Sequence, residues 1–338
     1  MTNQPPQLAG HDVFATDLAL VEGVAREGAG WADPMLRELG ELAGRPEVQA
    51  LGVQANTYPP VLRTHDRYGN RIDEVEFHPA WHELMTYAVG HGLHASPWRE
   101  PGPGAHVARA AAFTTWSHVE AGHGCPISMT YAAVPALRGT PAIADEWVPR
   151  LTSLEYDFGL RPTSEKRGAL SGMAMTEKQG GSDVRANTTR ATAAGVPGEY
   201  SLTGHKWFCS APMCDVFLML AQTPSGLSCF LVPRVLPDGT RNGIRLQRLK
   251  DKLGNRSNAS SEIELDDAWG VLLGEEGRGV ATIIEMVNFT RLDCVIGSSA
   301  GMRVGVAQAT HHAAHRAAFG KVLTDQPLMR NVLADLAV

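Results

Sequence analysis

Residues 173–183 read Met-Ala-Met-Thr-Glu-Lys-Gln-Gly-Gly-Ser-Asp and place small hydroxyl donors beside a pair of glycines. Glycines allow close approach of the backbone, and its N–H groups suit an anionic, phosphate-bearing ligand. Residues 205–210, His-Lys-Trp-Phe-Cys-Ser, add aromatic rings to cover a planar group and polar side chains to bond its edge. Each segment alone is also typical of a turn or a core strand. Their order and spacing favour the interpretation that residues 173–183 and 205–210 form the two halves of one ligand-binding surface, which we call the binding wall.

Three further motifs follow in the same order along the chain. They are Lys-Leu-Gly-Asn-Arg-Ser at 252–257, Gly-Glu-Glu-Gly at 274–277 and Arg-Ala-Ala-Phe-Gly at 316–320. Together, the five motifs resemble T-E-P-x-x-G-S-D, K-x-W-I-T-N, K-x-G-x-R-x-S, G-x-x-G and R-x-x-F-G of the acyl-CoA dehydrogenase flavoproteins. The variants at 176–183 and 248–256 most closely resemble the AidB-like, adaptive-response branch. The resemblance extends over essentially the whole chain.

The residue patterns predict an α+β multidomain fold. Helical patterns broken by Pro and Gly predict an N-terminal all-α domain over 1–168, with a hairpin or extended loop at 65–77. Short apolar runs bounded by turns predict a β-barrel or sandwich over 169–274. The runs expected to form strands are 169–175, 200–208, 216–222, 228–232 and 260–265.

After residue 274 the pattern predicts a long helix over 278–318 and another starting at 326. Two helices do not enclose a core, so each would leave one apolar face uncovered. The resemblance implies a C-terminal four-helix bundle. We therefore expect 275–338 to be the start of a truncated C-terminal α-helical bundle.

The resemblance implies FAD as the cofactor. It places Met173, Met175 and Thr176 along the isoalloxazine, with Gly181 and Ser182 at the ring edge and the pyrophosphate. Trp207 should pack on the flavin face, with Phe208, Cys209 and Ser210 beside its reactive edge. Cys209 departs from the family's Thr, and a thiol is the weaker hydrogen-bond donor. The remaining cofactor residues implied by the resemblance are Arg316, Phe319 and Gln326, with Arg316 reaching the diphosphate of a neighbouring subunit.

The implied reaction is α,β-dehydrogenation of an acyl-CoA thioester by a homo-oligomer, a tetramer, that shares FAD sites between subunits. It needs a carboxylate base in an apolar pocket. At the isovaleryl-type base position the chain has Thr290, whose hydroxyl is no such base. Glu285 and Asp293 fall on other helical faces, so structural roles are expected for both. We expect the catalytic base to be absent from this chain.

The composition is that of a globular protein, with 43% apolar residues and a formal charge of -6. This charge argues against nucleic-acid binding by the overall field. The five cysteines form no C-x-x-C pair, and His311, His312 and His315 have no further ligand nearby, so no metal site is predicted. No signal peptide or membrane span is recognised, and a cytoplasmic location is expected.

A basic stretch leaves a second role open. It comprises Arg234, Arg241, Arg245, Arg248, Lys250, Lys252 and Arg256. These side chains could contact phosphates, but a solvated loop and strand edge is the favoured interpretation. The alternative function is a DNA-associated flavoprotein of the alkylation-damage response with little or no dehydrogenase turnover. A helical scaffold that has lost its cofactor is a third hypothesis.

Overall fold

The computed structural model describes residues 3–338 and contains two compact units. One unit comprises Met1–Ala50, His106–Val119 and Cys294–Val338, and the other comprises Leu51–Ala105 and Glu120–Asp293. Neither unit ends at the predicted domain boundaries of 168 and 274. Each unit contains helical residues that precede the β-region and helical residues that follow it. The division into 1–168, 169–274 and 275–338 stays a prediction.

The N-terminal region is helical as predicted, and many of its helices carry proline in their first turn, where the missing N–H costs no helical hydrogen bond. Between α3 and α4 the chain forms a β-hairpin in which Leu62 pairs with Val75. This confirms the hairpin expected at 65–77. The elements are α1 (Leu18–Arg26), α2 (Asp33–Gly44), α3 (Pro46–Thr57), β1 (Val61–His65), β2 (Arg71–Glu76), α4 (Pro79–Gly90), α5 (Ser96–Arg99), α6 (Ala105–Ser117), α7 (Gly124–Arg138) and α8 (Pro141–Leu151).

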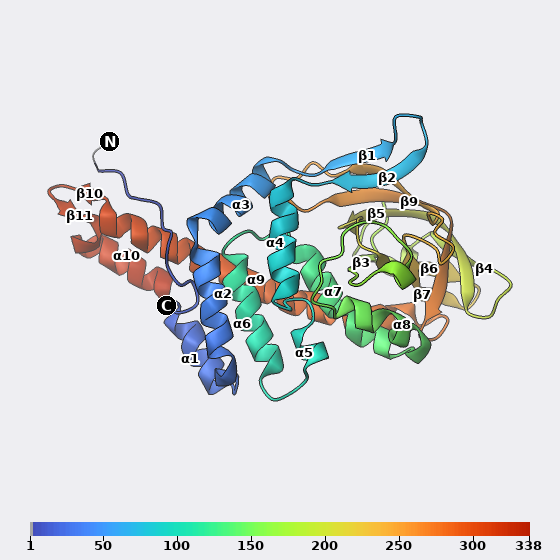
Figure 1. Cartoon of the computed structure of the whole chain (residues 1–338), viewed down its shortest axis with the longest axis horizontal. Coiled ribbons are helices and arrows are strands. Elements are labelled where there is room, and N and C mark those ends of the chain that lie inside the picture. Colours follow the sequence, from blue (N-terminus) through green and yellow to red (C-terminus); the bar gives the residue numbers. More distant parts are fainter. Residues whose placement is uncertain (1–2) are drawn as a thin grey trace. The chain divides into compact units, whose positions relative to one another are not determined.

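Seven strands form one sheet in the order β3-β6-β4-β5-β9-β7, with β8 paired to β9 (Figure 1). Strand β7 also pairs with β6, so the sheet closes on itself as a barrel. The turn at 223–226 joins β6 to β7, which correspond to the predicted runs 216–222 and 228–232, and Thr223 lies opposite Gly226. The strands are β3 (Ser171–Ala174), β4 (Arg190–Ala193), β5 (Glu199–Ser210), β6 (Val216–Thr223), β7 (Gly226–Pro233), β8 (Ile244–Leu249) and β9 (Ser260–Leu273).

A helix of 37 residues, α9 (Gly279–His315), follows the barrel. Its first turns bury Ile283, Met286 and Val287. A short hairpin of β10 (Ala317–Ala318) and β11 (Lys321–Val322) leads to α10 (Pro327–Ala337). Exposed apolar side chains remain on both helices, as expected, including Met302 at 69% and Leu328 at 77%. The C-terminal region is therefore helical, with apolar surface in contact with solvent.

Within residues 3–338, no helix is long and apolar enough to cross a membrane. Over the same residues, no group of three His, Cys, Asp or Glu side chains is arranged to hold a metal ion. All five cysteines are free thiols, and Cys209, Cys214 and Cys229 are buried.

Candidate flavin site

The two predicted halves of the binding wall meet in space. The backbone N–H of Trp207 donates to the carbonyl of Thr176 at 2.7 Å, and the N–H of Lys178 donates to Nε2 of His205 at 3.1 Å. These bonds join the loop after β3 to the end of β5. The two segments, about thirty residues apart in sequence, therefore form one surface.

The loop carries hydrogen-bond donors that the protein itself does not use. Among the described residues, the hydroxyls of Thr176 and Ser182 have no hydrogen-bond partner, and Ser182 is exposed. A Cβ at Gly181 would lie 2.8 Å from Oγ1 of Thr176, so only glycine leaves that hydroxyl in place. Gly180 has a φ of +116°, a backbone conformation that favours glycine. The loop thus presents unpaired donors at a place of close backbone approach, which fits a phosphate-bearing cofactor.

A β-bulge shapes the second half of the wall. Strand β5 pairs Lys206 with Ile263 and Cys209 with Ser261, so Trp207 and Phe208 together face one residue of β9. Lys206 and Cys209 are buried, Trp207 is half-buried, and Phe208 is 49% exposed. The bulge therefore presents two consecutive aromatic rings on the outer face of the barrel.

Cys209 and Ser210 follow the rings. Cys209 is 1% exposed, and burial raises the pKa of its thiol to about 12. Its thiol therefore stays protonated inside the barrel. Ser210 is half-buried, and its Oγ lies 3.4 Å from Oγ of Ser260. Of these two side chains, Ser210 is the more available to a ligand edge.

Three cations surround the indole of Trp207. Nζ of Lys250 lies 3.6 Å from the ring centroid, while Nζ of Lys178 and Cζ of Arg248 each lie 5.7 Å from it. Lys250 also lies 4.3 Å from the centroid of the Phe208 ring. Glu262 binds both Lys250 and Arg248 at 2.8 Å and so fixes these two cations. Attraction between these cations and the ring quadrupole holds Trp207 in place.

A buried ion pair lies directly behind the wall. Nζ of Lys206 lies 2.8 Å from Oε1 of Glu177, both side chains are fully buried, and Lys206 also donates to the carbonyl of Leu220 at 2.7 Å. Glu177 accepts further bonds from the backbone N–H groups of Thr188 and Thr189. This pair was not among the predicted site residues. It ties the loop at 176–189 to the strands of the barrel.

The pKa of Glu177 follows from these contacts. Burial raises it, but the Lys206 ammonium and the hydrogen bonds outweigh burial and lower the pKa from 4.5 to about 2. The ionised carboxylate is therefore the native form at neutral pH. Glu177 holds the loop in place and is not available as a base near pH 7.

This shift predicts acid sensitivity. The stability from ionised Glu177 is fully present above pH 4.5 and is lost as the pH falls from 4.5 towards 2, by about 3 kcal/mol in total. Urea unfolding of the native chain between pH 5.5 and 3 should show about 2 kcal/mol of this loss, and the Glu177→Gln variant should lack that component. Equal pH slopes for the two proteins would contradict the assignment.

The other predicted cofactor residues fall in two places. Met173 and Met175 are half-buried at β3, next to the loop, and the carbonyl of Met175 accepts a bond from Asn187 at 2.8 Å. Arg316, Phe319 and Gln326 belong to the other compact unit. The barrel unit therefore contains nine of the twelve predicted cofactor residues. As cofactor contacts, all twelve stay predictions.

The half-buried Thr290 at the isovaleryl-type base position lies in α9. Its hydroxyl donates to the carbonyl of Val287 at 2.9 Å, an intrahelical bond. Glu285 is exposed, and Asp293 is buried at 4% exposure. The Thr290 hydroxyl is therefore hydrogen-bonded within its own helix.

The basic stretch is largely neutralised. Arg241 pairs with Glu74, Arg245 with Asp266 at 3.4 Å, and both Arg248 and Lys250 with Glu262. Arg234 is buried, and its guanidinium donates to backbone carbonyls. Much of this stretch is strand β8, with Ile244 and Leu246 buried between outward-facing polar residues. The structure supports the strand-edge interpretation and gives no support to DNA binding here.

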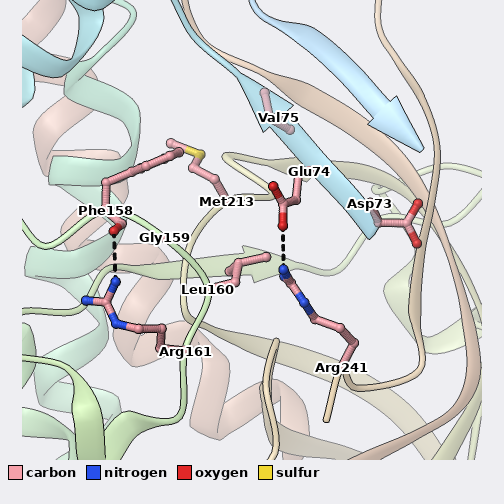
Figure 2. A pocket seen from close by; sticks show the side chains of 9 residues that line it. All are labelled: Asp73, Glu74, Val75, Phe158, Gly159, Leu160, Arg161, Met213 and Arg241. Atoms are coloured by element: carbon pink, nitrogen blue, oxygen red, sulfur yellow. Dashed lines mark hydrogen bonds and ion pairs between the residues drawn. The ribbon is translucent and has the colours of Figure 1, made fainter. Parts of the chain in front are cut away.

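A cavity of about 220 Å³ lies between β2 and the segment at 158–161, and it is lined by none of the predicted site residues. Figure 2 shows the carboxylate of Glu74 directed at Arg241, and Arg161 directed at the carbonyl of Phe158. Arg161 also pairs with Asp157, and Asp73 pairs with Arg71 at 2.7 Å, so the charges in this cavity are already paired. The wall between Thr176 and Trp207 remains the better candidate for a cofactor site.

Three family models match the chain in order. They are the adaptive response protein AidB N-terminal domain at 3–158, the acyl-CoA dehydrogenase middle domain at 172–268 and the acyl-CoA dehydrogenase C-terminal domain at 277–338. AidB of Escherichia coli (strain K12) is 52% identical over 338 residues, covering 99% of this chain and 62% of that protein. Acyl-CoA dehydrogenase family member 11 of Caenorhabditis elegans is 32% identical over 309 residues, covering 86% of this chain and 49% of that protein.

Solved structures agree with this comparison. ACDH-11 of Caenorhabditis elegans, in complex with C11-CoA, matches with a TM-score of 0.89 and 30% identity, covering 98% of this chain and 58% of that one. Butyryl-CoA dehydrogenase of Megasphaera elsdenii matches with a TM-score of 0.67 and 18% identity, covering 98% and 76%, which shows the fold alone. The chain thus spans between about half and three fifths of the length of its relatives from E. coli and C. elegans.

Proposed function

The chain belongs to the acyl-CoA dehydrogenase family, and from this premise we propose that it binds FAD and takes part in α,β-dehydrogenation of an acyl-CoA thioester. Members of this family bind FAD. The observation that carries the proposal is the 2.7 Å bond between Trp207 and Thr176, which joins a donor-rich loop to a pair of aromatic rings. The crystal structure of ACDH-11 with C11-CoA supports an acyl thioester as the substrate class.

In this proposal each part of the wall has a role in holding the cofactor. Trp207 covers one face of the isoalloxazine, and the Thr176 hydroxyl and nearby N–H groups bond its polar edge. Gly181 and Ser182 receive the pyrophosphate. When bound, FAD supplies the hydride acceptor, and the chain supplies position and hydrogen-bond donors. Met173 and Met175 form the apolar support beside the ring.

Arg316, Phe319 and Gln326 complete the proposal through a neighbouring subunit. A guanidinium can donate two bonds at once to a phosphate, which suits Arg316 to the cofactor diphosphate. The Arg316 guanidinium contacts the carbonyl of Asn3, and Gln326 donates to the carbonyl of Ala318 at 3.1 Å. We therefore propose a homo-oligomer whose FAD sites draw residues from two subunits.

The proposed activity predicts a spectroscopic result. Protein purified with FAD is expected to show the visible absorbance band of an oxidised flavin. In a form of the protein that includes a catalytic base, which is not expected within residues 1–338, anaerobic addition of saturated acyl-CoA thioesters of increasing length is expected to bleach that band. The reduced spectrum should recover on addition of an artificial electron acceptor. If no thioester bleaches a flavin that dithionite reduces readily, the dehydrogenase assignment is wrong while the cofactor assignment stands.

A further inference from the structure

A small cavity lies beside the Lys-Leu-Gly-Asn-Arg-Ser motif at 252–257, which has no part in the proposed flavin contacts. Its volume is about 130 Å³, and we call it the motif cavity. It lies between Pro59 and Pro60, which precede β1, and the segment at 249–260 that joins β8 to β9. Its polar lining residues are Lys250, Asp251, Lys252, Arg256, Asn258 and Ser260.

Cations outnumber carboxylates among the described residues that line the motif cavity. The single carboxylate, Asp251, is exposed. Lys250 is already bound to Glu262 at 2.8 Å. Lys252 and Arg256, unlike most of the basic stretch, form no ion pair within residues 3–338. On a chain of formal charge -6, the motif cavity is therefore a local site of attraction for a small anion.

Lys252 retains a hydrogen-bond donor for a ligand. Its ammonium is half-buried, and Nζ donates to the carbonyl of Asn258 at 2.6 Å and to Oγ of Ser260 at 3.2 Å. An ammonium has three N–H donors, so a third remains for a ligand. Burial lowers the pKa of Lys252, and the charge of Glu120 offsets this lowering only in part. An anion in the motif cavity would complete the compensation.

Asn258 supplies the opposite kind of group. Its side chain is 2% exposed, and its Oδ1 has no hydrogen-bond partner among the described residues. An unpaired buried acceptor costs about 1–3 kcal/mol, so a ligand that fits should donate a hydrogen bond as well as accept several. A cavity of about 130 Å³ holds a few water-sized groups, which suits a tetrahedral oxyanion rather than a nucleotide.

The loop that presents these groups is fixed at two points. The hydroxyl of Ser257 donates to Oε1 of Glu120 at 2.7 Å. The backbone N–H of Arg256 donates to Oδ1 of Asn56 at 3.2 Å. The backbone on both sides of the Arg256 side chain is therefore held in place, while its guanidinium is exposed and has no partner within the described chain.

We propose that the motif cavity binds inorganic phosphate in a protonated form, with Lys252 and Arg256 donating to its oxygens and its P–OH group donating to Oδ1 of Asn258. A guanidinium can donate two bonds at once to a phosphate. Inorganic phosphate at neutral pH carries both a proton and negative charge, so it matches both kinds of unpaired group. Sulfate has the same shape but no proton. This inference goes beyond the proposed function and depends neither on FAD nor on dehydrogenation.

The test compares three tetrahedral anions by calorimetric titration at pH 8 and constant ionic strength. They are inorganic phosphate, sulfate and methyl phosphate. All three are then mainly doubly charged, and of the three only inorganic phosphate keeps a proton to donate, because a phosphomonoester loses its proton near about pH 6. We expect inorganic phosphate to bind about tenfold more tightly than the other two, as one additional hydrogen bond allows. Equal affinity for sulfate or for methyl phosphate would overturn the proposal.

Each titration is made with and without saturating FAD. The phosphate affinity should be the same in both, because the motif cavity is separate from the proposed cofactor contacts. Loss of phosphate binding on addition of FAD would place the anion at the flavin wall and overturn the proposal. A chain that binds phosphate as expected but takes up no FAD would support the motif cavity and count against the proposed function alone.

Two variants locate the phosphate. Arg256→Gln removes an exposed cation and should weaken binding of phosphate about tenfold. Asn258→Ala removes the acceptor and should reduce the affinity for phosphate to that for sulfate. The matched control is Arg67→Gln, which removes an exposed arginine from the turn between β1 and β2 that does not line the motif cavity.

Circular dichroism checks that each variant is folded, and the exposed position of Arg256 keeps the test decisive if Asn258→Ala does not fold. Phosphate affinity that is unchanged in Arg256→Gln, or that falls equally in Arg67→Gln, would overturn the proposal. So would a folded Asn258→Ala protein that still prefers phosphate to sulfate.

Discussion

Replacement of Lys206 with methionine is expected to lower the free energy of unfolding by about 3–5 kcal/mol, because it leaves a buried carboxylate without its counter-charge. Glu177 and Lys206 are both fully buried, and their ion pair is 2.8 Å long. The carbonyl of Leu220 loses its bond from Lys206 at the same time. Urea unfolding monitored by circular dichroism measures the loss.

Two variants control this experiment. Lys178→Met removes an exposed lysine from the same loop and is expected to change stability by less than about 1 kcal/mol. The double variant Glu177→Gln/Lys206→Met removes both charges, so it should be more stable than Lys206→Met alone. If Lys206→Met unfolds at the same urea concentration as the native chain, the ion pair does not hold the loop as we infer.

Trp207→Ala is expected to weaken FAD binding by about 5- to 150-fold, because stacking of an aromatic side chain on a flat ring contributes about 1–3 kcal/mol. The indole is held by the Lys250 ammonium at 3.6 Å, so its position is already fixed in the wall. Fluorescence titration of the apoprotein with FAD measures the affinity. Trp207→Phe should retain most of it, since the ring is kept.

Trp269→Phe is the matched control for this second experiment. Its indole donates to Glu199 at 2.8 Å and lies outside the predicted site, so FAD affinity should not change. Circular dichroism of Trp207→Ala should match that of the native chain. Full FAD affinity in a folded Trp207→Ala protein would show that the cofactor does not stack on this residue.

The sequence predicted the elements whose signals are local. The Thr223 to Gly226 turn fixes the β6–β7 hairpin, and prolines mark the first turns of several helices. Strands β4 and β8 were not predicted. Strand β4 has four residues and depends on pairing with β5 and β6, which no local pattern reveals. In β8 the buried Ile244 and Leu246 alternate with polar residues, a period-2 pattern that could have identified a strand within the basic stretch.

The candidate site, like the fold, was predicted from the sequence only in part. Motif order identified both halves of the wall, and the structure brings them together through Thr176 and Trp207. The Glu177–Lys206 ion pair behind the wall was not predicted. Its two residues lie 29 positions apart in the sequence, and nothing in the local pattern of polar residues marks either one as buried. Only the pleat of β5, which turns Lys206 inward, makes it the partner of Glu177. The sequence motifs therefore identified the surface of the binding wall but not the buried ion pair that supports it.

The bulge in β5 makes this part of the chain sensitive to the number of its residues as well as to their identity. Deleting one residue between Lys206 and Cys209 would restore regular pairing with β9 and leave a single ring outside. Inserting one would send either the lysine or the thiol to the opposite face. Relatives that keep the same chemistry should therefore keep two residues between the positions of Lys206 and Cys209.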